Sequence, residues 1–152
     1  MKIVYHCYGG SHSSVTAAAI HLGYLAADKK PTPDALMMVP FFDKQTDKDH
    51  GKFKLMGKDE MGNQIYICGC RSLGTKMEKS LYGIARITDI PMDDVIFVDT
   101  LKGVNSLMRI GGFLSRKLRL VWLGRPIVLK GTVNAFNNFV KIVEEVKNKM
   151  QN

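Results

Sequence analysis

Short apolar runs and amphipathic stretches alternate along the chain, and together they predict strands followed by helices. Residues 2–6 form an apolar run that predicts a strand. The alanine-rich residues 15–22 predict a slim helix, which Gly23 ends and which Ser13 or Ser14 caps. The chain therefore opens as a strand, a loop and a helix that can pack closely against a sheet.

The middle of the chain predicts a hairpin and a second helix. Residues 53–56 and 64–68 have strand-like patterns, and the Gly62-Asn63 pair between them signals a turn. Apolar side chains at helical spacing then mark one face of a helix over residues 73–88.

The C-terminal third predicts two strands and two helices. Residues 94–100 are the clearest buried strand, because their continuous apolar run is typical of a central parallel strand covered on both faces. A helix follows over residues 104–118, although Gly111-Gly112 weakens it by about 1 kcal/mol per glycine relative to alanine. Residues 120–123 predict a last strand, and Thr132 caps a final helix. This order of elements predicts a single α/β domain, residues 1–152, with an open, mostly parallel sheet flanked by helices and one β-hairpin.

Length and composition agree with one domain that has a substantial core, since the chain has 152 residues. No run approaches the roughly 20 apolar residues of a membrane helix. The strand pattern directly after Met1 leaves no room for a signal peptide, so we expect a cytoplasmic protein. Cys7, Cys68 and Cys70 are odd in number and predict reduced thiols. Cys68 and Cys70 are too closely spaced for a usual zinc motif, so we expect a structural role for them.

The chain carries a formal net charge of +8, and one segment accounts for all of it. No Asp or Glu lies between residues 102 and 141. The basic residues there, called the basic segment below, are Lys102, Arg109, Arg116, Lys117, Arg119, Arg125, Lys130 and Lys141. Such a segment points to an anionic partner: a phosphorylated small molecule, nucleic acid or an acidic protein surface. A solvated face that aids solubility is the alternative explanation.

The loop between the first strand and the first helix carries the main candidate chemistry. It contains Gly9 and Gly10, followed by Ser11, Ser13 and Ser14. The backbone N–H groups of such a loop and the N-terminus of the helix converge on one point, where a phosphate or carboxylate is stabilised. The alternative is a glycine-rich connection in which Ser13 and Ser14 only cap the helix.

Two polar groups at strand ends extend this hypothesis. Cys7 lies at a helix N-terminus beside His6 and His12, a setting that favours a thiolate and hence a nucleophile; a small buried cysteine is the alternative. Asp99 and Thr100 end the strand at 94–100. Because ligands bind beyond the carboxyl ends of parallel strands, near the switch in strand order, we expect Asp99 and Thr100 beside the loop.

The loop resembles two known cysteine-containing phosphate loops. Low-molecular-weight tyrosine phosphatases and related arsenate reductases place a nucleophilic Cys, five residues, Arg and Ser after their first strand. Cys7 and Ser14 fall into that register, and Ser13 stands at the position of the Arg, which contacts the transferring phosphoryl group. The Cys-x-x-Gly-x-x-Ser/Thr-Ser pattern of sugar-phosphotransferase IIB domains is matched by Cys7, Gly10, Ser13 and Ser14. That resemblance implies a phosphocysteine held by backbone N–H groups without an arginine.

The loop also resembles a nucleotide-binding P-loop. The strand at 95–99 resembles the P-loop proteins' second element, which ends in an Asp that holds magnesium through water, and Ser14 matches the metal-side hydroxyl. His12 and Ser13 replace the Gly-Lys pair, so triphosphate chemistry would need a cation from elsewhere, such as the basic segment.

Along nearly its whole length the chain resembles a bacterial family, a domain of unknown function. The shared motifs are HCYGG-x-HSSVTAAAIHLG, FFDKQ…DHG and GGFLSR…LGRP. This resemblance implies membership of a family without an assigned activity, so it adds no catalytic residue to those named above.

These features together predict that the chain binds a phosphorylated or otherwise anionic small molecule, for which a nucleotide is one candidate, at the loop after the first strand. If the protein is an enzyme, we expect phosphoryl transfer through Cys7, with His12 or Asp99 as the acid and Arg125 as a counter-charge to the phosphate. The alternative is a non-catalytic module that binds nucleic acid or a protein through the basic segment, and nucleic acid is not favoured because no known nucleic-acid motif is present. No cofactor follows from the sequence.

The segment at residues 40–51 is a candidate substrate loop, because a polar stretch follows two aromatic residues. It contains Asp43, Asp47, Asp49 and His50, which are residue types that bind divalent metals. Their spacing matches no established ligand signature, so we expect a polar surface loop rather than a metal site.

Overall fold

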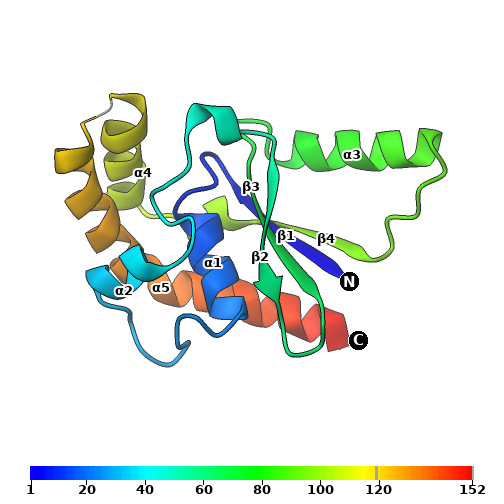
Figure 1. Ribbon diagram of the computed structural model, residues 1–152, viewed down its shortest axis with the longest axis horizontal. Helices are drawn as coiled ribbons and strands as arrows, with labels where there is room; N and C mark the ends of the chain where they lie inside the picture. The colour runs from blue at the N-terminus through cyan, green and yellow to red at the C-terminus, as the bar shows by residue number, and fades with distance from the viewer. Residues whose placement is uncertain (119, 152) are drawn as a thin grey trace.

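The computed structural model describes residues 1–118 and 120–151 and contains one four-stranded sheet in the order β2-β3-β1-β4 (Figure 1). The strands are β1 (Lys2–Cys7), β2 (Phe53–Lys58), β3 (Gln64–Gly69) and β4 (Val95–Asp99). β1 pairs in parallel with both β3 and β4, whereas β2 and β3 form an antiparallel hairpin. The predicted α/β class, with an open, mostly parallel sheet and one hairpin, is confirmed.

Helices cover the two faces of the sheet unequally. α1 (Ser13–His21) and the long α5 (Val121–Gln151) pack over the face that carries Ile3 and Tyr5, where the main hydrophobic core forms. α3 (Thr75–Ile87) lies over the opposite face, and Ala85 is its single buried residue (Figure 1). The smaller elements are α2 (Pro33–Met38), α4 (Ser106–Gly112), 3-10 turns at Asp47–Asp49 and Thr100–Gly103, and a π-helical turn at Phe113–Lys117. Within the described residues, no helix is both long and apolar enough to cross a membrane.

The predicted strand at residues 120–123 is wrong, because Val121 already begins α5. Four consecutive apolar residues do not distinguish a strand from a helix. The deciding feature is a close helix contact: a Cβ at Gly111 would lie 2.5 Å from the backbone nitrogen of Val128. Gly111, which weakens α4 in isolation, therefore allows α4 and α5 to pack backbone against backbone, whereas a Cβ at Gly112 would meet no described atom within 4 Å.

The strand at 94–100 is parallel as predicted, but the expectation that it is central is wrong. β4 is the edge strand next to β1, and Val98 is its only buried residue. The run is apolar because both faces of β4 are covered, one of them only loosely. On the loosely covered face, Phe97 lies under α3 and contacts the ring of Tyr82 at a centroid distance of 5.8 Å.

The expected capping role of Ser13 and Ser14 is also wrong. His12 is the N-cap residue of α1, and no side chain forms a capping hydrogen bond there. Both serine side chains are buried in the first turn. The helix ends as predicted, with Leu22 as the C-cap residue and Gly23 at a φ of 73°.

A buried hydrogen-bonded chain links β1, α1 and the β2–β3 turn. The hydroxyl of Tyr5 lies 2.7 Å from His21 Nδ1, and His21 Nε2 lies 3.3 Å from Asp59 Oδ2. Burial lowers the pKa of His21, and the hydrogen bond to Asp59 only partly opposes this. His21 is therefore neutral in the folded protein over a wider pH range than in the unfolded chain.

This network predicts a stability that falls in mild acid. Since the folded pKa of His21 lies below the ordinary value of 6.5, its contribution is fully present above about pH 6.5 and is lost as the pH falls below it. One proton taken up on unfolding corresponds to a slope of up to about 1.4 kcal/mol per pH unit. In urea titrations from pH 7 to pH 5, we expect His21→Gln to be less stable at pH 7 and to lose part of this slope. His50→Gln is the matched control, and equal slopes in wild type and His21→Gln contradict the prediction.

Candidate functional site

The loop after β1 lies at the switch in strand order. β1 lies between β3 and β4, with Cys7 opposite Gly69 and His6 opposite Asp99. The three parallel strands therefore end at one edge of the sheet. The connection after β1 passes through α1 on one face, and the connection after β3 passes through α3 on the other. Open α/β sheets bind their ligands at such a point.

The thiol of Cys7 lies at the base of this loop. Its Sγ accepts a hydrogen bond from the backbone N–H of Gly10 at 3.1 Å and lies 3.3 Å from the hydroxyl oxygen of Ser14. Gly10 has a φ of 64°, which turns the chain back over the sulfur. A backbone N–H thus points at the Cys7 sulfur, and the Ser14 hydroxyl lies within hydrogen-bond distance of it.

The loop hydroxyls hold the loop in place. The hydroxyl oxygens of Ser13 and Thr100 lie 3.0 Å apart, and Thr100 also lies within hydrogen-bond distance, 2.9 Å, of the carbonyl oxygen of His6. Ser11 Oγ accepts from the backbone N–H of Gln45 at 3.3 Å. A ligand would therefore meet the backbone of the loop rather than these serine and threonine side chains.

Two glycines bring the loop into direct contact with the end of β3. A Cβ at Gly10 would lie 2.6 Å from the backbone nitrogen of Gly69, and a Cβ at Gly69 would lie 2.7 Å from the carbonyl carbon of Gly9. The backbone N–H of Cys70 also donates to the carbonyl oxygen of Cys7 at 2.9 Å. Gly69 thus supports the backbone of the loop. Its position between two cysteines in the sequence did not indicate this contact.

The carboxylate of Asp43 joins the loop to α5. Its Oδ1 lies 3.0 Å from His12 Nε2, and its Oδ2 accepts from Arg125 Nε at 2.6 Å. The Asp43 side chain is 1% exposed, whereas that of Arg125 is 42% exposed. A buried carboxylate thus fixes a histidine of the loop and an arginine that reaches solvent. From the sequence, Asp43 lay in the candidate substrate loop and was expected on a polar surface loop rather than in a metal site. The expected surface position is wrong for Asp43, because its side chain is buried.

The segment that carries Asp43 is strained and is tied to the loop. Phe41 and Asp43 have φ values of 65° and 54°, in the left-handed region that L residues rarely adopt. The backbone N–H of Asp43 donates to the carbonyl oxygen of Ser11 at 3.0 Å, and the Phe42 ring packs edge-on against His12. Strained residues of this kind concentrate at functional sites.

The other acidic candidates form local contacts. Asp99 Oδ1 accepts from the backbone N–H of Leu101 at 2.9 Å, so Asp99 caps the 3-10 turn that follows β4. Hydrogen bonds from Lys54 and from Thr46 lower the pKa of Asp49. Within the part of the chain that the structure describes, no three His, Cys, Asp or Glu residues are grouped to hold a metal ion.

The basic segment is distributed over several elements. Lys102 lies in a 3-10 turn, Arg109 in α4, and Lys130 and Lys141 in α5, all exposed. Arg119 and the side chains of Arg116 and Lys117 lie outside the described part. Arg125 is thus a member of this segment that the structure links to the loop.

The chain belongs to the family described as "Protein of unknown function (DUF3189)", whose model matches residues 2–148. This agrees with the family resemblance of the sequence. The comparisons with curated proteins and with solved structures return no match.

The contact between Gly69 and the loop predicts a difference between two glycine substitutions. Gly69→Ala places a methyl group against the backbone of Gly9, and we expect a destabilisation of about 1–3 kcal/mol. Gly9→Ala is the matched control, since a Cβ at Gly9 has no neighbour within 4 Å among the described atoms. Urea denaturation measures both variants, and equal stabilities would contradict the packing account.

Proposed function

We propose that the protein binds the phosphoryl group of a small phosphorylated molecule at the loop of residues 7–14. The observation that carries this proposal is the position of the Cys7 sulfur, which receives the Gly10 N–H and lies beside the Ser14 hydroxyl at the base of the loop. The backbone of this loop and the N-terminus of α1 then supply donors for the phosphoryl oxygens.

Arg125 supplies the cation that the loop sequence lacks. Its Nε donates to Asp43 Oδ2, and its side chain is 42% exposed. Through Asp43, this guanidinium is fixed relative to His12 and hence to the loop. Arginine binds phosphate in a planar, bidentate manner, which suits a group held in this way.

The same arrangement supports phosphoryl transfer through Cys7. The Cys7 sulfur attacks phosphorus, an S–P bond forms, and the P–O bond to the leaving group breaks. The leaving oxygen takes a proton from His12, whose protonated form the Asp43 carboxylate favours. Water then hydrolyses the phosphocysteine to inorganic phosphate, and His12 regains its proton. We assign the acid to His12 rather than to Asp99, because Asp99 is in register with His6 and therefore belongs to the face of the sheet opposite to Cys7.

Binding is tested with inorganic phosphate and tungstate by calorimetry. We expect Arg125→Gln and Asp43→Asn to weaken binding by about 10- to 100-fold, since each loses a charge-assisted hydrogen bond. Arg109→Gln, an exposed member of the basic segment on α4, is the matched control. Equal weakening by Arg109→Gln and Arg125→Gln would favour the alternative, a diffuse anionic partner such as nucleic acid.

The covalent step has its own test. After incubation with acetyl phosphate or p-nitrophenyl phosphate, we expect mass spectrometry to find a phosphoryl group on Cys7. Cys7→Ser should lose this modification while Cys68→Ser retains it. An unmodified Cys7, together with unchanged phosphate affinity in Cys7→Ser, would remove the covalent mechanism and leave the binding proposal standing.

A further inference from the structure

A second constellation of reactive groups lies at the same edge of the sheet, on the face opposite to Cys7. Cys70 Sγ lies 3.6 Å from His6 Nδ1, and His6 Nε2 lies 2.7 Å from Glu78 Oε1. This is a thiol, an imidazole and a carboxylate in a hydrogen-bonded row. A nucleophile beside a base, with the base oriented by a third group, is the arrangement that covalent catalysis uses.

The three groups come from three elements that the fold holds in place. His6 is near the end of the central strand β1, Cys70 directly follows β3, and Glu78 lies in the first turn of α3. His6 and Cys70 are buried, and the Glu78 side chain is 22% exposed. The Cys70 thiol therefore lies in the interior, and the Glu78 carboxylate is the member of the row that contacts solvent.

The Cys70 thiol is protonated near neutral pH, so it needs a base such as His6 in order to react as a nucleophile. Burial raises the pKa of Cys70, and the backbone N–H of Gly74 only partly opposes this. The sulfur is therefore a protonated thiol near neutral pH, and a base must remove the proton before it can attack. His6 is the base within hydrogen-bond reach.

An apolar groove begins next to this row on the same face. Val4, Tyr66 and Phe97 lie two residues before His6, Cys68 and Asp99 on their strands, and they line a cavity of about 330 Å³ together with Leu81 of α3. Leu81 follows Glu78 by one helical turn, so α3 borders both the row and the groove.

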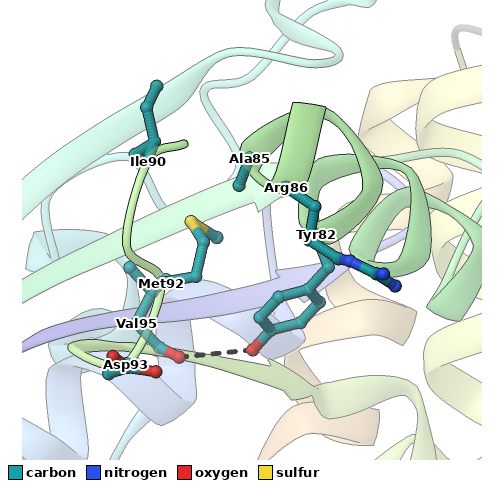
Figure 2. A pocket seen from close by; sticks show the side chains of 7 residues that line it. All are labelled: Tyr82, Ala85, Arg86, Ile90, Met92, Asp93 and Val95. Atoms are coloured by element: carbon teal, nitrogen blue, oxygen red, sulfur yellow. Dashed lines mark hydrogen bonds between the residues drawn. The ribbon is translucent and has the colours of Figure 1, made fainter. Parts of the chain in front are cut away.

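The groove continues along α3 to a second cavity of about 420 Å³ (Figure 2). Ala85, Ile90, Met92 and Val95 line both cavities. Figure 2 shows the Tyr82 hydroxyl directed at the carbonyl oxygen of Val95, to which it donates at 3.4 Å. The volume of each cavity is that of a small-molecule site. The lining of the first cavity is mostly apolar and suits a hydrocarbon chain, whereas Arg86 and Asp93 make part of the second cavity polar.

From this geometry we propose that Cys70 is the nucleophile of a second site, which accepts an acyl group from a thioester whose aliphatic chain lies in the groove under α3. Two features define the ligand. A thiol with a base attacks a carbonyl carbon, and the apolar groove on the same face of the sheet accommodates an aliphatic chain attached to that carbon. This site lies on the other face of the sheet from the phosphate loop and does not depend on the function proposed there.

The step balances without an oxidant, a reductant or a metal. The Cys70 proton moves to His6 Nδ1, the sulfur forms a bond to the carbonyl carbon, and the bond from that carbon to the leaving sulfur breaks. The leaving thiolate takes the proton from His6, and Glu78 balances the imidazolium in between. The products are an acyl thioester on Cys70 and a free thiol.

The test uses the full chain and the S-octanoyl and S-acetyl thioesters of N-acetylcysteamine, with peptide mapping by mass spectrometry. We expect acylation of Cys70, at least about tenfold faster with octanoyl than with acetyl, because the groove buries the longer chain. Cys70→Ala should lose the label. Cys68→Ala is the matched control: Cys68 is buried on the same face, burial raises its pKa to about 12, and it has no histidine hydrogen bond among the described residues.

Two further variants separate the base from the groove. Glu78→Gln should lower the rate of acylation by about tenfold or more and shift its pH profile, while Glu78→Asp retains part of the rate. Ala85→Leu, which fills the groove, and Ile84→Asp, which makes its exposed rim polar, should lower the octanoyl rate by a larger factor than the acetyl rate. Labelling of Cys7 or Cys68 in place of Cys70, or equal rates for the two thioesters in wild type, would overturn the proposal.

Discussion

Successive residues of a strand point to opposite faces of the sheet, and the end of β1 places different chemistry on each face because of this. His6 faces α3 and bonds to Glu78, whereas Cys7 faces α1 and lies beside Ser14. β1 can do this because it is hydrogen-bonded on both sides, to β3 and to β4. A shift of one residue in the register of β1 would exchange the two side chains and dismantle both arrangements at once.

The loop depends in turn on a charge that the fold buries. A carboxylate that is 1% exposed is costly unless it is paired, and Asp43 is paired with both His12 and Arg125. The Arg125 guanidinium compensates this charge, and the His12 ring lies within hydrogen-bond distance of the same carboxylate. The carboxylate therefore links the strained segment, the loop and α5, three parts of the chain that lie far apart in sequence.

The local parts of this architecture could be predicted from sequence, and the non-local parts could not. The β1 strand, the loop and α1 follow one another directly, so an apolar run, two glycines and an alanine-rich helix were sufficient. The hairpin followed from its turn residues in the same way. The edge position of β4 and the helical start of α5 depend on packing partners elsewhere in the chain, which local patterns do not contain.

The site shows the same division. Cys7, His12 and Arg125 were identified by residue type and position, yet the group that connects the last two, Asp43, lies in a segment without periodicity. The Cys70–His6–Glu78 row spans 72 residues from His6 to Glu78, and each member has an ordinary explanation when taken alone.

The two faces also differ in the physical character of the ligand they can accept. On the α1 side, serine hydroxyls are used within the loop, so an anion would rely on backbone N–H groups and on a guanidinium held by Asp43. On the α3 side, Val4, Tyr66 and Phe97 offer apolar surface that a charged group would have to be desolvated to reach. Desolvation would therefore oppose a phosphoryl group at this apolar surface and would not oppose a hydrocarbon chain there. This difference in polarity, rather than a difference between the two thiols, is what would direct a substrate to one end of β1 or the other.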